Sequence, residues 1–306
     1  MFRLINAGAM LLLFLLPISA QKGKTVVASG GYRSSLISSE GSRVQIYDLD
    51  SRLMKRKMPF AVILPKDYAD PKFGQRKYPV VYLLHGLFGH FDNWTKKTSL
   101  VDYSVATDFI IVTPEGGDGW YTDSPVKPDD KYESYIIQEL IPEMDNRFRT
   151  IAEARGRVIA GLSMGGYGAI KYGLKYPDKF SLVGSFSGAL GASSFLEKIP
   201  GSIGKTIDVI FGPAGSETRK NNDVFAMVRD VTPESKKTIP YIYLSCGTED
   251  FLFANNREFV DILNQKAIPH EYRELPGGHT WQFWDSQVRE FLRLAEARLN
   301  LQTIPK

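Results

Sequence analysis

Residues 158–166, Val-Ile-Ala-Gly-Leu-Ser-Met-Gly-Gly, decide the fold of this 306-residue chain. The apolar residues before Ser163 are typical of a strand buried on both faces, and the residues after it predict a helix. The pattern G-x-S-x-G at Gly161, Ser163 and Gly165 sets a serine hydroxyl on the sharp turn between them, where glycine lets strand and helix approach closely. The pentapeptide alone also occurs by chance in glycine-rich loops, but its strand-turn-helix context favours a nucleophilic serine over a structural turn.

Apolar runs typical of strands alternate with amphipathic segments typical of helices along most of the chain. This alternation predicts an α/β fold with a mostly parallel central sheet, covered by helices on both faces. The first two strands are adjacent in sequence and predict an antiparallel hairpin at one edge of the sheet. The predicted strands cover residues 44–49, 58–64, 80–84, 109–112, 158–162, 180–186, 241–244 and 272–275, and the predicted helices cover residues 132–148, 164–176, 255–266 and 281–299.

The chain divides into segments of different composition. Residues 1–20 combine a basic residue, a continuous apolar run and a small-residue end at Ala20, which is the pattern of a secretory signal peptide. The apolar run is shorter than the ~20 residues that span a bilayer, so we expect export to the periplasm or the outside of the cell without a permanent anchor. Residues 21–42 predict a flexible lead-in and residues 43–300 a single domain, in which the Gly-, Ser- and Pro-rich residues 188–223 predict a small cap insertion.

Composition excludes several classes of protein. Hydrophobic residues make up 43% and charged residues 24% of the chain, which is the balance of a globular protein. The net charge is 38 − 34 = +4 and is scattered along the chain, so we expect no nucleic-acid partner. The single cysteine, Cys246, forms no internal disulfide and is too few for a cysteine-rich zinc site.

A nucleophilic serine needs a base, and the base needs a carboxylate that orients it. In chains with this turn the acid and then the histidine follow the serine, and of the four histidines only His270 and His279 follow Ser163. His270 begins a predicted strand. His279 lies in the loop after that strand, at the carboxyl end of the sheet, where catalytic residues of such folds lie, and is therefore the candidate base. The loop after the preceding strand contains Asp250 as the best candidate acid and Glu249 as the runner-up.

The negative charge that develops when an ester is attacked needs N–H donors. One candidate is the backbone N–H of Met164, directly after the serine. The second is the N–H of Leu87, in the glycine-bearing turn 85–89 that follows a predicted strand. We interpret His85 as the residue that organises this turn, with no role in proton transfer.

Four aromatic residues near these loops are candidates for a substrate pocket. Trp120 and Tyr121 lie in the loop after residues 109–112, and Trp281 and Trp284 follow His279 closely. Aromatic platforms suit sugar rings and aromatic acyl groups. Packing against the C-terminal helix explains the aromatic residues equally well.

These features together resemble the α/β-hydrolases of the "Putative esterase" family. The family includes esterase D (S-formylglutathione hydrolase), feruloyl and acetyl xylan esterases, tributyrin esterase, enterochelin esterase and the antigen 85 mycolyltransferases. The resemblance implies an α/β-hydrolase fold and a catalytic triad of Ser163, Asp250 and His279 that transfers an acyl group in two steps, with no metal or organic cofactor. It extends from about Met58 to Leu299 and rests on MPFAVILPKDY (58–68), YPVVYLLHGLFG (78–89), GLSMGGYGAIKYGLKYPDKF (161–180), CGTEDFL (246–252) and GGHTWQFW (277–284).

The leading hypothesis is an exported serine carboxylesterase that hydrolyses short-chain acyl esters or carbohydrate-linked acetyl or feruloyl esters. Three alternatives stay open: an acyltransferase of the mycolyltransferase type, a thioesterase similar to S-formylglutathione hydrolase, and a non-catalytic carbohydrate-binding protein. The expected partner is a small-molecule or carbohydrate ester. The sequence does not decide the natural ester or the oligomeric state.

Overall fold

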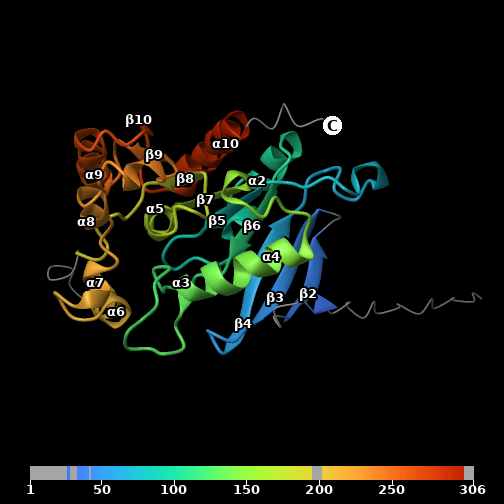
Figure 1. Cartoon of the computed structure of the whole chain (residues 1–306), viewed down its shortest axis with the longest axis horizontal. Helices are drawn as coiled ribbons and strands as arrows, with labels where there is room; N and C mark the ends of the chain where they lie inside the picture. Colours follow the sequence, from blue (N-terminus) through green and yellow to red (C-terminus); the bar gives the residue numbers. More distant parts are fainter. Residues whose placement is uncertain (1–25, 28–32, 41–42, 195–201, 300–306) are drawn as a thin grey trace, which may run out of the picture.

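The computed structural model describes residues 26–27, 33–40, 43–194 and 202–299, so the expected signal peptide lies outside the described residues. Its centre is one sheet with the strand order β1-β2-β3-β4-β6-β5-β7-β8-β9-β10 (Figure 1). The strands are β1 (Val26–Val27), β2 (Arg33–Glu40), β3 (Val44–Ser51), β4 (Arg56–Ile63), β5 (Val80–Leu84), β6 (Ile110–Pro114), β7 (Arg157–Leu162), β8 (Leu182–Phe186), β9 (Tyr241–Gly247) and β10 (His270–Leu275).

The sheet has a parallel part and an antiparallel extension. Strands β5 to β10 pair in parallel, whereas β1 to β4 pair antiparallel and join the rest through β4 and β6. Strands β5 to β8 are buried along their whole length, which explains their continuous apolar sequences. The carboxyl ends of the parallel strands therefore meet at one edge of the sheet, and the predicted α/β class is confirmed.

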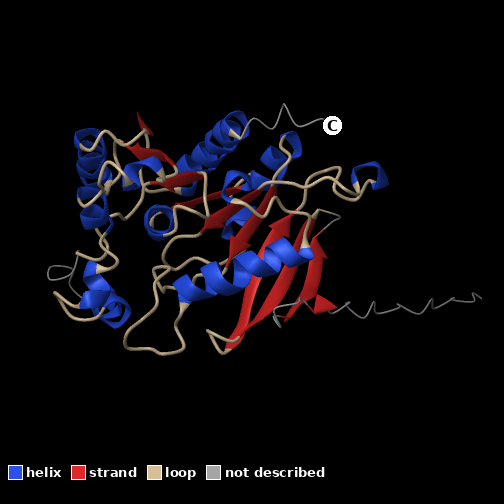
Figure 2. Cartoon of the chain, viewed as in Figure 1, coloured by secondary structure: helices blue, strands red, loops and turns tan. Residues whose placement is uncertain are grey.

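Helices cover both faces of the sheet (Figure 2). Buried side chains form two cores, and neighbouring residues of β5 alternate between them, with Tyr82 in one core and Val81 and Leu83 in the other, because successive strand residues point to opposite faces. The main helices are α1 (Asn93–Lys97), α2 (Leu100–Tyr103), α3 (Tyr132–Ser134), η3 (Tyr135–Leu140), α4 (Ile141–Arg147), α5 (Met164–Lys175), α6 (Ser202–Phe211), α7 (Glu217–Lys220), α8 (Val224–Arg229), α9 (Phe253–Gln265) and α10 (Trp281–Arg298), and single 3₁₀ turns are η1 (Pro71–Phe73), η2 (Ser104–Ala106), η4 (Ala154–Gly156) and η5 (Ser235–Lys237).

Part of the predicted flexible lead-in is a strand, so that prediction is wrong for residues 33–40. Strand β2 pairs antiparallel with β3, which moves the predicted β3–β4 hairpin away from the edge of the sheet. The sequence of β2 shows no alternation of apolar residues, and its Leu36 and Ile37 are exposed. Backbone pairing with β3 holds the strand instead. The hydroxyl of Ser34 donates to the buried carboxylate of Glu143 on α4, and this polar contact anchors the strand.

The predicted cap, residues 188–223, contains α6 and α7, and residues 195–201 lie outside the described part of the chain. In Figure 1 these helices occupy the same end of the molecule as α8 and α9. Ile207 and Phe211 of α6 are buried in the larger core, and the hydroxyl of Tyr167 on α5 donates to the carbonyl of Asn222. The segment is therefore packed onto the main core, and its role as a cap stays a prediction.

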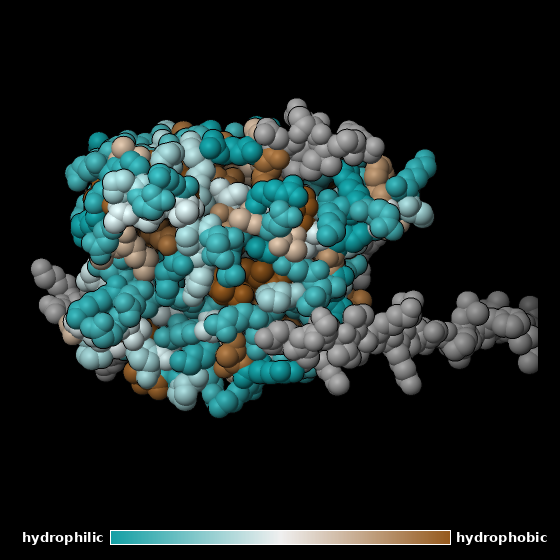
Figure 3. All heavy atoms as spheres, viewed as in Figure 1, coloured by the Kyte–Doolittle hydropathy of each residue, from teal (hydrophilic) through white to brown (hydrophobic). Residues whose placement is uncertain are grey.

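The described surface is mostly hydrophilic on the face drawn in Figure 3, with hydrophobic side chains in small groups. Among the described residues, no helix combines the length and the apolar character needed to cross a membrane. Cys246 is buried at the end of β9, and burial raises the pKa of its thiol to about 12, which supports a structural rather than a reactive cysteine.

The turn between β7 and α5 brings the helix against the end of β5. A Cβ atom on Gly165 would lie far inside van der Waals contact with the carbonyl oxygen of Leu84, and one on Gly161 would lie 2.5 Å from the carbonyl group of Gly165. Glycine is therefore required at both positions, as the G-x-S-x-G pattern predicts.

This close approach predicts whether an alanine at Gly165 stabilises or destabilises the fold. Alanine normally stabilises a helix relative to glycine by about 1 kcal/mol, but we expect Gly165→Ala to lower the free energy of unfolding by about 1–3 kcal/mol, because the methyl group overpacks the turn. Chemical denaturation measures the change. Gly278→Ala is the control, since a Cβ there meets nothing nearer than 3.8 Å, and a stabilised Gly165→Ala variant would contradict the packing described.

Candidate active site

Ser163 occupies a strained backbone position at the carboxyl edge of the sheet. Its φ of 52° and ψ of −116° lie outside the regions that side chains other than glycine usually adopt. Hydrogen bonds hold this conformation, because its N–H donates to the carbonyl of Phe186 at 2.9 Å and its carbonyl accepts from the N–H of Ala189 at 3.0 Å. The side chain remains partly exposed at the start of α5.

The structure brings Ser163, His279 and Asp250 into one hydrogen-bonded chain. His279 Nε2 lies 3.0 Å from Ser163 Oγ, and His279 Nδ1 lies 2.9 Å from Asp250 Oδ2. The three residues follow β7, β10 and β9, whose carboxyl ends share one edge of the sheet. Since a carboxylate only accepts, Nδ1 carries the proton and Nε2 is free to accept one from the serine hydroxyl.

The side chain of Asp250 is fully buried, whereas that of His279 is 20% exposed. Burial alone would raise the pKa of Asp250, but the hydrogen bonds from His279 and from the N–H of Leu252 outweigh it and hold the pKa below its usual value. Asp250 is therefore ionised at neutral pH. A buried negative charge of this kind keeps the imidazole oriented and stabilises its protonated form.

Glu249, the runner-up acid, has different contacts. Its carboxylate accepts hydrogen bonds from the hydroxyl of Thr248 and from the N–H of Gly277. It thus joins the loop after β9 to the loop that carries His279, and it does not contact the imidazole ring.

The turn after β5 lies directly beside Ser163. His85 Nδ1 is 2.8 Å from the carbonyl of Gly86, and the N–H of Gly116 is 2.9 Å from His85 Nε2. A carbonyl only accepts and an N–H only donates, so both contacts form together only in the neutral imidazole with its proton on Nδ1. His85 thus ties its own turn to the loop after β6, and no acceptor for the N–H of Leu87 occurs within the described residues.

Sequence reasoning missed two carboxylates in the loop after β6. Glu115 accepts hydrogen bonds from the N–H groups of Gly117 at 2.7 Å and Phe91 at 3.2 Å, and Asp118 accepts from the N–H of Phe88 at 2.7 Å. Burial would raise the pKa of Glu115, but the hydrogen bonds from the N–H groups of Gly117 and Phe91 hold the pKa below its usual value. The available signal was their position directly after a buried strand, at the same sheet edge as Ser163.

A cavity of about 330 Å³ opens beside Ser163 and His279. Trp281 and Trp284, two of the candidate pocket residues, line it, and Phe88 and Phe251 add exposed rings. No described residue of 188–223 lines it. The remaining lining residues are Gly86, Leu87, Gly89, Asn93, Lys97 and Leu162.

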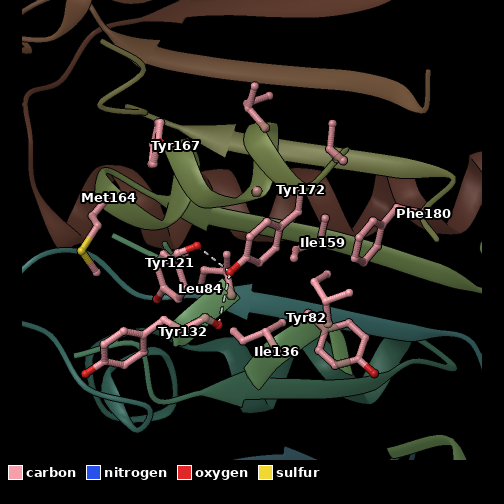
Figure 4. Close-up of a cluster of buried hydrophobic side chains, with 14 of the residues drawn as sticks. Tyr82, Leu84, Tyr121, Tyr132, Ile136, Ile159, Met164, Tyr167, Tyr172 and Phe180 are labelled. Atoms are coloured by element: carbon pink, nitrogen blue, oxygen red, sulfur yellow. Dashed lines mark hydrogen bonds between the residues drawn. The ribbon is translucent and has the colours of Figure 1, made fainter. Parts of the chain in front are cut away.

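The structure puts Trp120 and Tyr121 elsewhere. Figure 4 shows Tyr121 within a cluster of buried side chains, and its hydroxyl donates to the carbonyl of His85 at 3.0 Å. The ring of Trp120 packs against Tyr167 and Phe211. Neither residue is among those that line the cavity, because both side chains turn into the core, where Tyr121 supports the turn after β5 through its hydrogen bond to His85.

A model of the family described as "Putative esterase" matches residues 51–294. The chain belongs to this family. Its most similar relatives include the acetyl esterase of Caldicellulosiruptor saccharolyticus, which is 30% identical over 251 residues that cover 78% of this chain and 92% of the relative. A solved structure of a ferulic acid esterase is 29% identical, has a TM-score of 0.73 and covers 84% of this chain and 98% of its own.

The diacylglycerol acyltransferase/mycolyltransferase Ag85B of Mycobacterium leprae is also similar, with 25% identity over 297 residues and 86% of each chain covered. These findings confirm the resemblance inferred from the sequence motifs. This esterase-family chain is an enzyme, a serine hydrolase that acts on carboxylic esters.

The low pKa of Glu115 predicts a pH dependence of stability. Because folding lowers its pKa below 4.5, the carboxylate stabilises the fold in full above pH 4.5, and this contribution is lost as the pH falls through the lowered pKa. Between about pH 5 and pH 2.5 the wild type should therefore lose more free energy of unfolding than Glu115→Gln, by roughly 1 kcal/mol. Denaturant titrations across this range measure the difference, and Glu258→Gln, at a side chain that is 62% exposed, is the control. Parallel curves for wild type and Glu115→Gln would contradict the prediction.

Proposed function

We propose that this chain is an exported serine carboxylesterase that hydrolyses short-chain acyl esters or carbohydrate-linked acetyl or feruloyl esters. The observation that carries the proposal is the hydrogen-bond chain from Ser163 through His279 to Asp250, which opens onto a cavity. A serine beside an imidazole that a carboxylate orients is the arrangement that activates a hydroxyl toward an ester carbonyl. Export is supported by the signal-peptide pattern of residues 1–20.

The first step acylates the enzyme. His279 Nε2 takes the proton of Ser163 as Oγ attacks the carbonyl carbon of the ester, and a tetrahedral intermediate forms. The N–H groups of Leu87 and Met164 stabilise its oxyanion; as the first residue of α5, Met164 has an N–H without a partner in the helix. The bond between the acyl carbon and the alcohol oxygen then breaks, and the alcohol leaves with the proton from His279.

The second step returns the enzyme to its starting state. His279 takes a proton from water, whose oxygen attacks the acyl-serine, and the acid is released as Ser163 regains its proton. Asp250 stays ionised throughout and stabilises the imidazolium that forms in each step. The lowered pKa of Asp250 supports this role.

The size and lining of the cavity support small or aromatic substrates. A volume of about 330 Å³ with Trp281, Trp284 and Phe251 in its wall suits an acetyl group, a short acyl chain or a single ring. The names of two relatives, an acetyl esterase and a ferulic acid esterase, support the same range.

Transfer of the acyl group to a sugar is a second candidate function, which the similarity to the mycolyltransferase supports. Mass spectrometry after turnover of a p-nitrophenyl ester in the presence of a disaccharide separates the two reactions. We expect the free acid as the main product. A predominance of acylated sugar would overturn hydrolysis as the main reaction.

Removal of the Ser163 hydroxyl tests the proposed nucleophile. We expect Ser163→Ala to lower kcat/KM for p-nitrophenyl acetate and butyrate by at least about 10⁴-fold, because no acyl-enzyme can form, and to abolish labelling by a fluorophosphonate probe. The variant should unfold at the same denaturant concentration as the wild type. Ser194→Ala, at an exposed serine, is the control and should keep both activity and labelling.

Two matched substitutions, each replacing a carboxylate by its amide, distinguish between the two candidate acids. We expect Asp250→Asn to lower kcat by about 10³–10⁴-fold, because an amide favours the wrong imidazole tautomer and cannot stabilise the imidazolium. Glu249→Gln should lose less than about tenfold, since the amide oxygen still accepts from the N–H of Gly277. Steady-state kinetics measure both, and the reverse order of effects would assign the acid to Glu249.

A further inference from the structure

The cavity beside Ser163 combines aromatic walls with one cationic side chain. Its described lining contains no aspartate or glutamate, and Lys97 at the end of α1 is its only lysine or arginine. The Lys97 Nζ lies 5.1 Å from the centre of the Trp281 ring. A positive charge over an apolar, aromatic wall suits a ligand that carries a negative charge beside a ring or carbon skeleton.

Lys97 also differs from its neighbour on the same helix. Lys96 Nζ forms an ion pair with Asp92 at 2.7 Å, whereas no carboxylate of the described residues lies within 4.0 Å of Lys97 Nζ. Lys97 is exposed, so its charge remains available to a molecule that enters the cavity. The acidic residue directly before this helix, Asp92, therefore pairs with Lys96.

Ring contacts connect Lys97 to His279 and indicate which part of the substrate it meets. The rings of His279 and Trp284 lie 4.8 Å apart, and those of Trp284 and Trp281 lie 5.3 Å apart. In the proposed reaction His279 gives its proton to the leaving oxygen, so the alcohol lies beside this imidazole. The wall that continues from His279 through the two tryptophans to Lys97 therefore borders the alcohol.

We propose that the alcohol portion of the substrate carries an anionic group, a carboxylate or a phosphate, which Lys97 binds while the adjoining skeleton packs on Trp281. This inference rests on the proposed esterase function and narrows its substrate class. Two tryptophan rings separate Lys97 from His279, so Lys97 does not contact the reacting bond. It therefore binds the substrate and the transition state equally, and its loss changes KM more than kcat.

The test compares matched acetate esters of phenols. The anionic substrates are 4-acetoxybenzoate and 4-acetoxyphenyl phosphate, and the neutral one is methyl 4-acetoxybenzoate. For each enzyme the measured quantity is the ratio of kcat/KM for an anionic ester to that for the neutral ester. Differences in intrinsic reactivity cancel when this ratio is compared between wild type and variant.

We expect Lys97→Met to lower the ratio by about fivefold, mainly through KM, which is the size of one exposed charge pair. Lys97→Arg should keep the ratio, and Lys96→Met is the matched control that should leave it unchanged. Raising the salt concentration should lower the wild-type ratio toward that of Lys97→Met. The anionic ester with the larger effect identifies the group as a carboxylate or a phosphate.

Two results would overturn the inference while leaving the esterase function intact. One is turnover of all three esters with the same ratio in wild type and Lys97→Met. The other is an effect of Lys97→Met only when the charge is on the acyl side, measured with mono-4-nitrophenyl succinate against its methyl ester. Failure of the wild type to hydrolyse any of these esters would instead refute the proposed function itself.

Discussion

The contact between helix α5 and the end of β5 is the constraint on which the rest of the structure depends. Gly165 lies against the carbonyl of Leu84, and no side chain fits between them. Beside this contact the turn at Ser163 has a positive φ, and the serine lies next to the turn that starts at His85. The strain is held by hydrogen bonds to the neighbouring strand and loop, so the geometry of the serine is built into the sheet.

Polar contacts around this constraint fix the groups that would meet a developing charge. Neutral His85 ties the turn after β5 to the loop after β6, and Asp118 holds the N–H of Phe88. On the other side of Ser163, Glu249 joins the loop of the acid to the loop of His279. Dipoles that are already oriented need no rearrangement when charge forms, which is the main source of electrostatic catalysis.

Much of the fold could be predicted because its signals are local. The buried parallel strands are continuous apolar runs, and the G-x-S-x-G pattern predicts a strand directly before Ser163 and a helix directly after it. Strand β2 was missed because backbone pairing and the contact of Ser34 with Glu143 hold it, and neither leaves a pattern in the sequence. Trp120 and Tyr121 were placed in a pocket from their position in the chain, but side chains in a loop can turn to either side, and these two turn into the core.

The sequence by itself determined the family, the α/β class and the order of Ser163, Asp250 and His279 along the chain, because glycine requirements and strand hydrophobicity act between near neighbours. Only the tertiary structure decided which carboxylate contacts the imidazole, since Asp250 and Glu249 are adjacent and differ only in direction. It also decided the walls of the cavity, where Lys97 of α1 meets Trp281 of α10. These elements are distant in sequence, and only the packing of both helices on one face of the sheet brings them together.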